Sequence, residues 1–265
     1  MPVALIGCGN LGSHIARGIA TGAAGAYRLT AVFNGARHAK ARRLAQETGA
    51  CACETLEALL ATRPEYVVEA ASGSVLGDIA VPCLRAGASL IVLSTGAFAD
   101  TRLLAAAADT AREHRSKIYF ASGALGGFDV AQAAMIGGDL NVSMTTEKPP
   151  RAFGELPAVA DGPDDDAVRE VYRGSAREAI ARFPKNVNVV VALGLATTGL
   201  DRTKIAIRSN PRLTSNRHVV MLDGAFGTAR VEIEARPSPD HPQSSLLAAY
   251  SVLALLRKIA SPIQI

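Results

Sequence analysis

The sequence contains no apolar stretch that is both long enough and uncharged enough to span a lipid bilayer. It also lacks the basic segment followed by an apolar one that marks a secretory signal peptide, because its first apolar run, residues 3–6, ends in a glycine turn. We therefore expect a cytoplasmic protein with no membrane partner. With 265 residues, of which 49% are hydrophobic and 20% charged, the chain has enough core for one large domain or two smaller ones.

Cysteine is scarce, with four residues in the whole chain: Cys8, Cys51, Cys53 and Cys83. Cys51 and Cys53 form a C-x-C pair, but no second pair and no nearby group of histidines completes a zinc site. Reduced, apolar thiols are the simpler interpretation. An acidic triplet at residues 164–166 is better explained as a helix start, where the helix dipole favours negative charge, than as a metal site. We expect no bound metal.

Runs of basic residues are absent as well. The 28 Lys and Arg residues and the 24 Asp and Glu residues are spread along the chain and leave a net charge of +4. This distribution predicts no nucleic-acid partner, because such binding needs basic residues gathered in a patch. A small positive excess suits an anionic substrate or cofactor but does not identify one.

The most informative stretch that is present is a glycine-rich turn, GCGNLG at residues 7–12. An apolar run precedes it and an amphipathic stretch, residues 11–21, follows it, so the order is strand, turn and helix, as in dinucleotide-binding folds. There the first glycine permits the tight bend, the second lets a pyrophosphate approach the backbone, and the third lets helix and strand pack. A plain turn is the alternative, since short glycine turns are common. The cofactor contacts expected here are Gly7, Gly9, Asn10, Leu11 and Gly12.

Strands and helices alternate along the first 121 residues. Apolar and β-rich runs predict further strands at residues 27–33, 51–53, 66–70, 90–93 and 117–120. Amphipathic stretches between them predict helices at residues 38–48, 56–62, 75–86 and 101–114. The alternation predicts an α/β fold with a Rossmann-type, doubly wound parallel sheet, which forms a dinucleotide-binding domain over residues 1–121.

The pattern changes in the second half, where strands outnumber helices. We expect strands at residues 142–145, 204–208, 218–222 and 229–235. We expect a turn at residues 147–150 and helices at residues 130–136, 167–181, 186–197 and 244–259. Residues 122–242 are thus predicted to form an α+β substrate and dimerisation domain with a mainly antiparallel sheet, and the C-terminal segment 243–265 to join the first domain.

The end of the second predicted strand bears on which nicotinamide cofactor is used. An NAD-type site carries an acidic residue there, which accepts hydrogen bonds from the ribose. This sequence has the neutral Asn34, followed by Arg37, which removes the repulsion against a 2′-phosphate and offers it a partner. The alternative is that Arg37, like Arg42 and Arg43, belongs to the solvated face of the next helix. We expect NADP or NAD as the cofactor, with Asn34 and Arg37 in its site.

Three polar stretches in the second half are candidates for chemistry: SGALGGFD at residues 122–129, FPKNVN at 183–188 and NRH at 216–218. Together with GCGNLG, with GLDRTK at 199–204 and with SSLLAAYSVLALLR at 244–257, they resemble the motifs of the L-aspartate dehydrogenase family, in the same order and at similar spacing. The resemblance covers essentially the whole chain. It implies oxidation of L-aspartate to iminosuccinate with NAD or NADP, and a link to NAD biosynthesis.

The resemblance also implies site residues. His218 matches the catalytic histidine of the family, and Ala124 and Asn188 match residues that contact its nicotinamide cofactor. Asn34 departs from the family, because many relatives carry an acid there, which leaves the coenzyme preference open. Asp-His-Pro at residues 240–242 stands where relatives often have Asn-Pro, a change that we expect to affect only a loop.

The chemistry of amino-acid oxidation independently favours a histidine. Hydride leaves Cα only when the nitrogen can donate its lone pair, so the ammonium must first lose a proton to a group that titrates near neutrality. The same imidazole could then activate water to attack the imine, which gives oxaloacetate and ammonia. Of the five histidines, only His218 lies in a polar turn that leads into a strand of the second domain. A structural histidine is the alternative.

A dicarboxylate substrate needs cationic and polar groups to hold its two carboxylates. Each of the residues named below is a candidate for this role, and the alternative interpretation is that it is an ordinary surface residue. The candidates are Lys185, Arg202, Lys204, Arg208 and Arg212, with Ser215 and Asn216 as further hydrogen-bond donors.

Two other functions stay open from the sequence. Relatives of homoserine dehydrogenase and dihydrodipicolinate reductase share the two-domain plan, although the FPKN and NRH stretches argue against them. A non-catalytic sensor of NADP would carry the glycine turn without a well-placed acid–base residue, and His218 argues against that. We also expect a homodimer, because an apolar second-domain sheet often pairs with that of a second copy.

Overall fold

The computed structural model describes residues 1–153, 167–183, 188–236 and 245–263. The chain divides into two compact units: a first unit of Met1–Gly123 with Leu246–Ile265, and a second unit of Ala124–Ser245. Among the helices of the described residues, none is long and apolar enough to cross a membrane.

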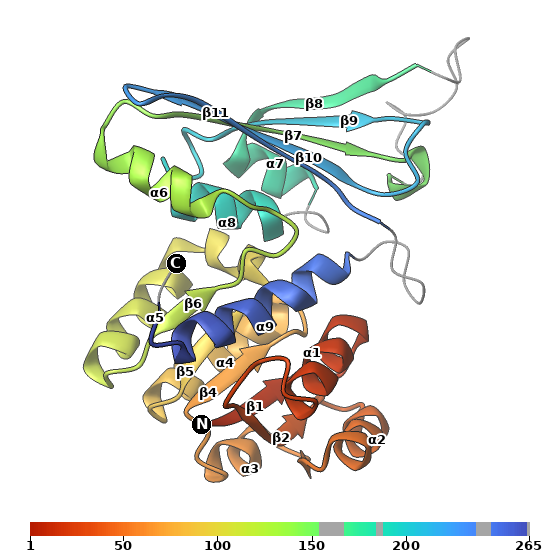
Figure 1. The fold of residues 1–265 in the computed structure, drawn as a ribbon, viewed down its shortest axis with the longest axis vertical. Coiled ribbons are helices and arrows are strands. Elements are labelled where there is room, and N and C mark those ends of the chain that lie inside the picture. Colours follow the sequence, from red (N-terminus) through yellow and green to blue (C-terminus); the bar gives the residue numbers. More distant parts are fainter. Residues whose placement is uncertain (154–166, 184–187, 237–244, 264–265) are drawn as a thin grey trace. The chain divides into compact units, whose positions relative to one another are not determined.

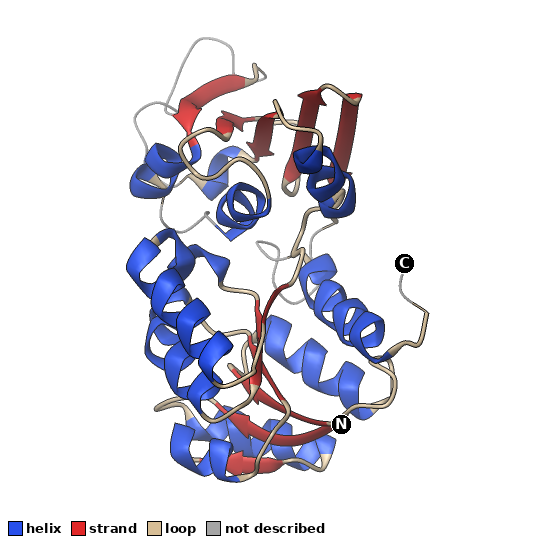
Figure 2. Ribbon diagram, turned by 90° about the vertical axis from the view of Figure 1, so that its left-hand side faces the viewer, coloured by secondary structure: helices blue, strands red, loops and turns tan. Residues whose placement is uncertain are grey.

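The first unit is built on a six-stranded parallel sheet with helices on both of its faces (Figures 1 and 2). The strand order β3-β2-β1-β4-β5-β6 is that of the Rossmann fold, so the predicted doubly wound sheet is confirmed. The strands are β1 (Pro2–Ile6), β2 (Arg28–Phe33), β3 (Cys51–Cys53), β4 (Tyr66–Glu69), β5 (Ser89–Val92) and β6 (Ile118–Phe120). The helices are α1 (Asn10–Ala20), α2 (His38–Thr48), α3 (Leu56–Ala61), α4 (Gly73–Arg85), α5 (Thr101–Glu113) and α9 (Leu246–Ala260), with a 3-10 helix, η1 (Thr95–Ala99).

The central strands are apolar on both sides because helices cover both faces of the sheet. In β1, the residues from Val3 to Ile6 are all buried. The last helix of the chain, α9, packs against α1, where a Cβ added to Gly18 would lie 2.4 Å from Cδ1 of Leu253. A small residue at position 18 therefore lets the two helices approach closely, and α9 completes the core of the first unit.

The second unit contains a five-stranded sheet in the order β11-β10-β7-β9-β8, with α6, α7 and α8 on one side of it (Figure 1). Only β7 and β9 pair in parallel; the other three pairs are antiparallel, so the predicted mainly antiparallel sheet is confirmed. The strands are β7 (Asn141–Lys148), β8 (Arg169–Ser175), β9 (Lys204–Ser209), β10 (Arg217–Gly224) and β11 (Gly227–Glu234). The helices are α6 (Phe128–Ile136), α7 (Ala176–Arg182) and α8 (Asn188–Ala196), with a 3-10 helix, η2 (Pro150–Ala152).

The helix predicted at residues 167–181 is wrong in its first half. Residues 169–175 form the edge strand β8, which pairs with β9, and α7 begins only at Ala176. Ser175 starts α7 through a capping box: its hydroxyl accepts the N–H of Glu178, and the Glu178 carboxylate accepts the N–H of Ser175. Val171 and Tyr172 favour strands and precede that cap, so the sequence held a sign that a strand, and not a helix, comes before Ser175.

The strand predicted at residues 142–145 is too short, and the turn predicted at residues 147–150 is wrong for its first half. β7 continues to Lys148, because it pairs with β10 on one side and with β9 on the other. Its polar residues weaken the alternating pattern that marks a strand in a sequence. The acidic triplet at 164–166, Lys185 and the Asp-His-Pro at 240–242 lie outside the described residues.

Candidate active site

The glycine turn between β1 and α1 needs its first and third glycines for reasons internal to the protein. Gly7 has a φ of +99° and donates its N–H to the carbonyl of Phe33 at 2.9 Å. A Cβ on Gly7 would lie 2.6 Å from the backbone of Ala70, and one on Gly12 would lie 1.9 Å from the carbonyl oxygen of Gly7. Only glycine satisfies both positions, since any side chain would collide with the main chain.

Gly9 differs from these two glycines because nothing in the protein occupies the space next to it. A Cβ added to Gly9 would have no neighbour within 4 Å, and Gly9 caps α1 without any side-chain hydrogen bond. Asn10 and Leu11 form the start of the helix, where N–H groups and the positive end of the helix dipole favour an anion. Burial raises the pKa of the Cys8 thiol to about 11, so the turn adds no negative charge of its own. The open space beside Gly9 leaves room for a phosphate group to approach the backbone closely.

Asn34 links the glycine turn to the loop that follows β2. Its Oδ1 accepts the N–H of Cys8 at 2.7 Å, and its Nδ2 donates to the carbonyl of Arg37 at 3.3 Å. The Arg37 side chain is exposed and makes no hydrogen bond or ion pair within the described part of the chain. Arg42 and Arg43, in contrast, pair with acidic residues, Arg43 with Glu47 at 3.0 Å. Of these three arginines, Arg37 is thus the one whose charge stays available to a ligand.

Glu69 is a buried acid at the carboxyl end of β4 that sequence reasoning missed. Its carboxylate accepts the N–H of Ala71 at 2.7 Å and the N–H of Ser94 at 2.9 Å, which ties together the loops after β4 and β5. Burial raises the pKa of this carboxyl group above its usual value. Ligands of doubly wound sheets bind at this edge, so Glu69 orders two loops at the edge where a ligand of this fold is expected. The sequence did contain a sign of this site, because an acidic residue directly follows the run Tyr-Val-Val at the end of the strand.

His218 lies on β10 and is 3% exposed. It stands opposite Thr146 of β7 in the antiparallel register, and its Nδ1 lies 3.1 Å from Oγ1 of Thr146. When Nδ1–H donates to that hydroxyl, Nε2 is left with the lone pair that can accept a proton. Burial, with a smaller effect from the positive charge of Lys148, lowers the pKa of His218 to about 4, so the imidazole is neutral at neutral pH. The structure therefore holds a neutral, oriented imidazole in the second unit.

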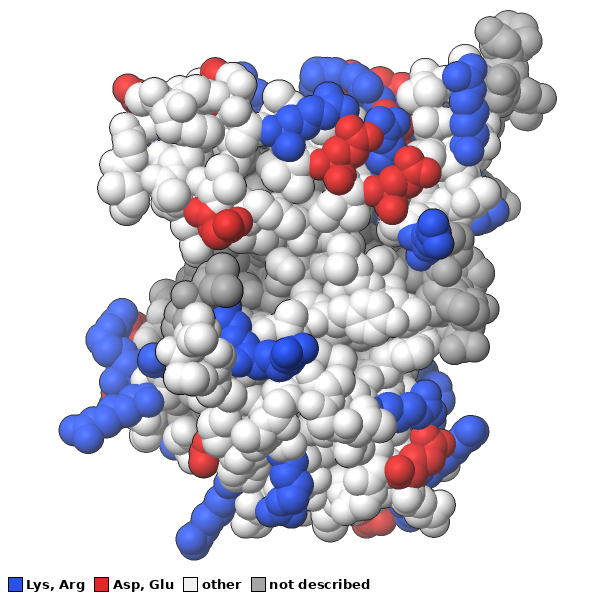
Figure 3. Space-filling view, in the orientation of Figure 1, with Lys and Arg blue, Asp and Glu red and all other residues white. Residues whose placement is uncertain are grey.

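The second sheet has two faces of different character. The buried face carries His218, Thr146 and Lys148, together with apolar neighbours of His218 such as Val220. The outer face carries Arg217 and other charged side chains, which form ion pairs between neighbouring strands and along β11. These pairs include Arg217 with Glu232, Arg230 with Glu232, and Arg208 with Glu147 and Glu170. Figure 3 shows basic and acidic side chains lying next to one another in this unit.

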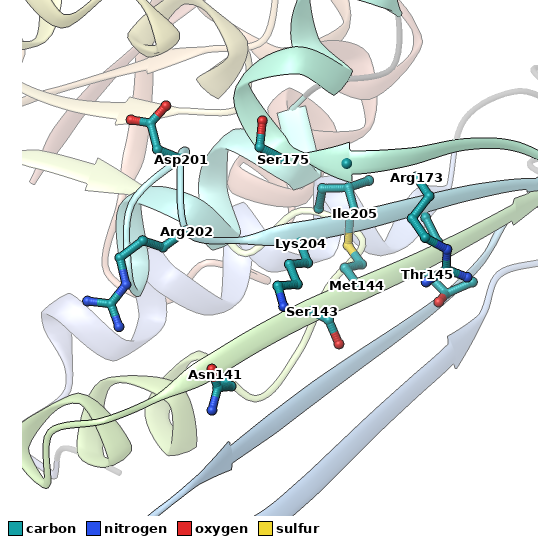
Figure 4. Close-up of a pocket in the computed structure, with 12 residues that line it drawn as sticks. Asn141, Ser143, Met144, Thr145, Arg173, Ser175, Asp201, Arg202, Lys204 and Ile205 are labelled. Carbon is teal, nitrogen blue, oxygen red and sulfur yellow. The ribbon is translucent and has the colours of Figure 1, made fainter.

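The register places two substrate candidates, Lys204 and Arg208, on the outer face, opposite to His218. Arg208 stands opposite Glu147 of β7, and Lys204 stands opposite Ser143. Residues 143 and 147 alternate along β7 with the residues whose side chains lie on the buried face. Lys204 and Arg202 line an open pocket of about 650 Å³ on that outer face (Figure 4). The sheet itself therefore separates Lys204 and Arg208 from the imidazole, and Arg202 lies beside Lys204 in the same pocket.

The remaining candidates lie in loops or at helix starts of the second unit. Ser215 and Asn216 are half-buried in the segment that leads into β10, while Arg212 in the same segment is exposed. Ala124 follows Gly123, whose φ is +64° and whose N–H donates to Oγ of Ser251. Asn188 is the first residue of α8. Among the described residues, no three His, Cys, Asp or Glu side chains gather as metal ligands would.

A parallel sheet of the Rossmann order, an open glycine turn and a second unit with a buried histidine define a two-unit dehydrogenase that binds NAD or NADP. A family model for the NAD-binding domain of homoserine dehydrogenase matches residues 7–121, and one for the C-terminal part of aspartate dehydrogenase matches residues 129–259. L-aspartate dehydrogenases of Methanococcoides burtonii and Methanosarcina mazei are 35% and 36% identical, over 100% of this chain and 99% of each relative. The chain belongs to the L-aspartate dehydrogenase family.

Solved structures agree with this assignment. Aspartate dehydrogenase from Thermotoga maritima matches with a TM-score of 0.79 at 27% identity, over 100% of this chain and 99% of that one. A putative myo-inositol dehydrogenase from Sinorhizobium meliloti matches with a TM-score of 0.55 at 17% identity and shares only the fold. The second unit distinguishes this chain from homoserine dehydrogenases, because it matches the model for aspartate dehydrogenase. The resemblance inferred from the sequence motifs is thereby confirmed.

Proposed function

We propose that this chain oxidises L-aspartate to iminosuccinate with NAD or NADP, and that water then converts the imine to oxaloacetate and ammonia. The observation that carries the proposal is the neutral, buried imidazole of His218, held by Thr146 in the unit that matches aspartate dehydrogenase. We place the cofactor on the glycine turn, with Gly7, Gly9, Asn10, Leu11 and Gly12 at its pyrophosphate, Asn34 and Arg37 at its ribose, and Ala124 and Asn188 at its nicotinamide.

The role of His218 follows from the proton balance of the reaction. The substrate nitrogen arrives as an ammonium and must lose a proton before its lone pair can assist the departure of hydride from Cα. Nε2 of His218 takes this proton, while Thr146 holds Nδ1 and fixes the orientation of the ring. A nicotinamide cofactor held by the first unit would supply the acceptor for this hydride. Once this proton has passed from Nε2 to solvent, the neutral imidazole can again act as a base, and it then activates the water that attacks the imine.

Replacement of His218 by alanine tests this assignment. We expect His218→Ala to lower kcat for L-aspartate by about 10²–10⁴-fold, the usual contribution of a general acid–base group, without weakening cofactor binding. The measurement is the initial rate of NAD(P)H formation, with the cofactor Kd from fluorescence titration. His114→Ala, which removes a half-buried histidine of the first unit, is the matched control and should keep full activity. Unchanged kcat in His218→Ala would refute the role.

The finer assignments extend this proposal. We propose that NADP is accepted alongside NAD, because the neutral Asn34 and the unpaired charge of Arg37 leave room for a 2′-phosphate. We also propose a cytoplasmic homodimer whose product supplies NAD biosynthesis. Half-buried Val219 and Met221 on the outer face of the second sheet support pairing of two copies through that face.

A further inference from the structure

Lys148 is a buried lysine on the same face of the second sheet as His218. It ends β7 two residues after Thr146, so strand alternation places both on the buried face, and it is 6% exposed. Thr146 lies directly opposite His218 in the strand pair. Lys148 is therefore one diagonal step from His218, a separation that a long side chain can bridge.

The protonation states of these two groups are linked by charge. Burial lowers the pKa of Lys148 to about 8, so its amine is still mainly cationic at pH 7. That cation helps to lower the pKa of His218, and it is the one charged group with such an effect in the described part of the chain. The other charged neighbours on these strands, Glu147 and Arg217, lie on the outer face, and the facing residue of β11 is the apolar Ile233.

An imidazole with so low a pKa is a weak acceptor for the proton of an ammonium group. A carboxylate next to Lys148 would offset the lysine charge and place negative charge near the ring. Both effects favour the protonated form of His218. Binding of the substrate carboxylate would then raise the pKa of His218, so that the imidazole becomes a better acceptor for the ammonium proton.

We propose that Lys148 binds one carboxylate of the substrate, and that this ion pair enables His218 to take up the proton released by the substrate ammonium. In this step the N–H bond of the ammonium breaks, Nε2 of His218 gains the proton, and the amine keeps the electron pair. The inference rests on the proposed function, because it takes the substrate to be a dicarboxylic amino acid. Lys148 is thus added to the seven substrate candidates taken from the sequence. The sequence pattern did not indicate it, because that pattern places residue 148 in a turn at residues 147–150.

Kinetics of Lys148→Met give the first test, because methionine fills a buried site without a charge. We expect KM for L-aspartate to rise by about tenfold or more, since a charge-assisted contact is lost, while the cofactor Kd changes by less than about twofold. The acid limb of kcat/KM should move to higher pH, because the like charge beside His218 is gone. Lys148→Arg should restore most of the L-aspartate affinity. Lys117→Met removes an exposed lysine of the first unit and serves as the control.

An NMR titration of His218 in the cofactor-free protein gives a readout that does not depend on turnover. Succinate, a dicarboxylate without an amine, should raise the pKa of His218 by about one unit or more in the wild type and leave it unchanged in Lys148→Met. An equal response in both proteins, or an unchanged KM in Lys148→Met, would overturn the proposal. A wild type that does not oxidise L-aspartate would instead overturn the proposed function, and the succinate titration would still decide whether Lys148 binds a carboxylate.

Discussion

Asn34 and Arg37 are the two residues on which our proposal for cofactor choice rests. The Asn34 side chain bonds to the backbone of the glycine turn, as the neutral counterpart of an acid at this position. Arg37 caps α2 from an exposed position, whereas Arg43 on the same helix is paired with Glu47. The difference between the two arginines lies in their partners. The Arg43–Glu47 pair follows from its i,i+4 spacing on a predicted helix, whereas the lack of a side-chain partner for Arg37 among the described residues is seen only in the structure.

Arg37→Gln tests the proposed contact with a 2′-phosphate. We expect kcat/KM for NADP to fall by about tenfold, the loss of one charge-assisted hydrogen bond, while kcat/KM for NAD changes little. The measurement is a comparison of both cofactors at saturating L-aspartate. Arg43→Gln is the matched control, because it removes the same charge from the same helix and should alter neither value. A wild type with a strong preference for NAD would contradict the NADP proposal.

At the scale of elements, the glycine turn was predictable and the polar strands were not. The strand–turn–helix order is a local pattern, and the predicted start of α1 was off by one residue. β7 and β8 hold many polar or charged residues, and they are strands because they pair with β9 and β10. Pairing between distant segments is decided by tertiary structure, so the alternation of apolar residues gave an incomplete signal.

Gly9→Ala tests whether the turn holds a pyrophosphate. The added methyl group enters open space at an ordinary φ, so the free energy of unfolding should change by less than about 0.5 kcal/mol. The cofactor Kd should rise by about tenfold or more, because the methyl group occupies the space required for close approach of the phosphates. Urea denaturation measures the free energy of unfolding, and calorimetric titration measures the cofactor Kd.

Gly77→Ala on α4 is the control for Gly9→Ala, since it also adds a methyl group in open space and should leave cofactor binding intact. Gly12→Ala should instead destabilise the first unit, because its Cβ collides with the carbonyl of Gly7. Wild-type affinity in Gly9→Ala would show that the cofactor lies elsewhere.

For the whole molecule, the two units contribute different kinds of information. The first unit matches a model named for homoserine dehydrogenase, whereas the second unit matches one named for aspartate dehydrogenase. A nucleotide-binding fold is shared by many dehydrogenases, so family membership is decided by the second unit and by full-length relatives. The second unit also contains the buried imidazole, whose burial has a consequence for the stability of the protein.

The stability of the second unit should fall in mild acid. His218 has a pKa of about 4 when folded and 6.5 as its ordinary value, so below pH 6.5 the unfolded chain binds a proton that the folded protein does not. Between pH 7 and pH 5 this difference lowers the free energy of unfolding by about 2 kcal/mol. Urea denaturation at several pH values, followed by circular dichroism, measures it.

His218→Gln removes this titrating group and should flatten the decline in stability between pH 7 and pH 5. The ion-paired acids of the outer face, such as Glu232, keep their charge in this range, because their pKa values are lowered from 4.5. Glu69, with its raised pKa, acts in the opposite direction. The difference between His218→Gln and the wild type therefore isolates the histidine, and equal slopes would show that His218 is not buried in its neutral form.

The sequence by itself determined the class of the first unit, the mixed character of the second and the family to which the chain belongs. These features rest on local patterns: glycines at fixed spacing, alternation of strands and helices, and short motifs in a fixed order. Only the tertiary structure showed that Arg208 faces away from His218, that Glu69 joins two loops and that Lys148 shares the buried face of the second sheet with His218. The reason is that burial and the face of a strand depend on which segments pair, and those segments are far apart in the sequence.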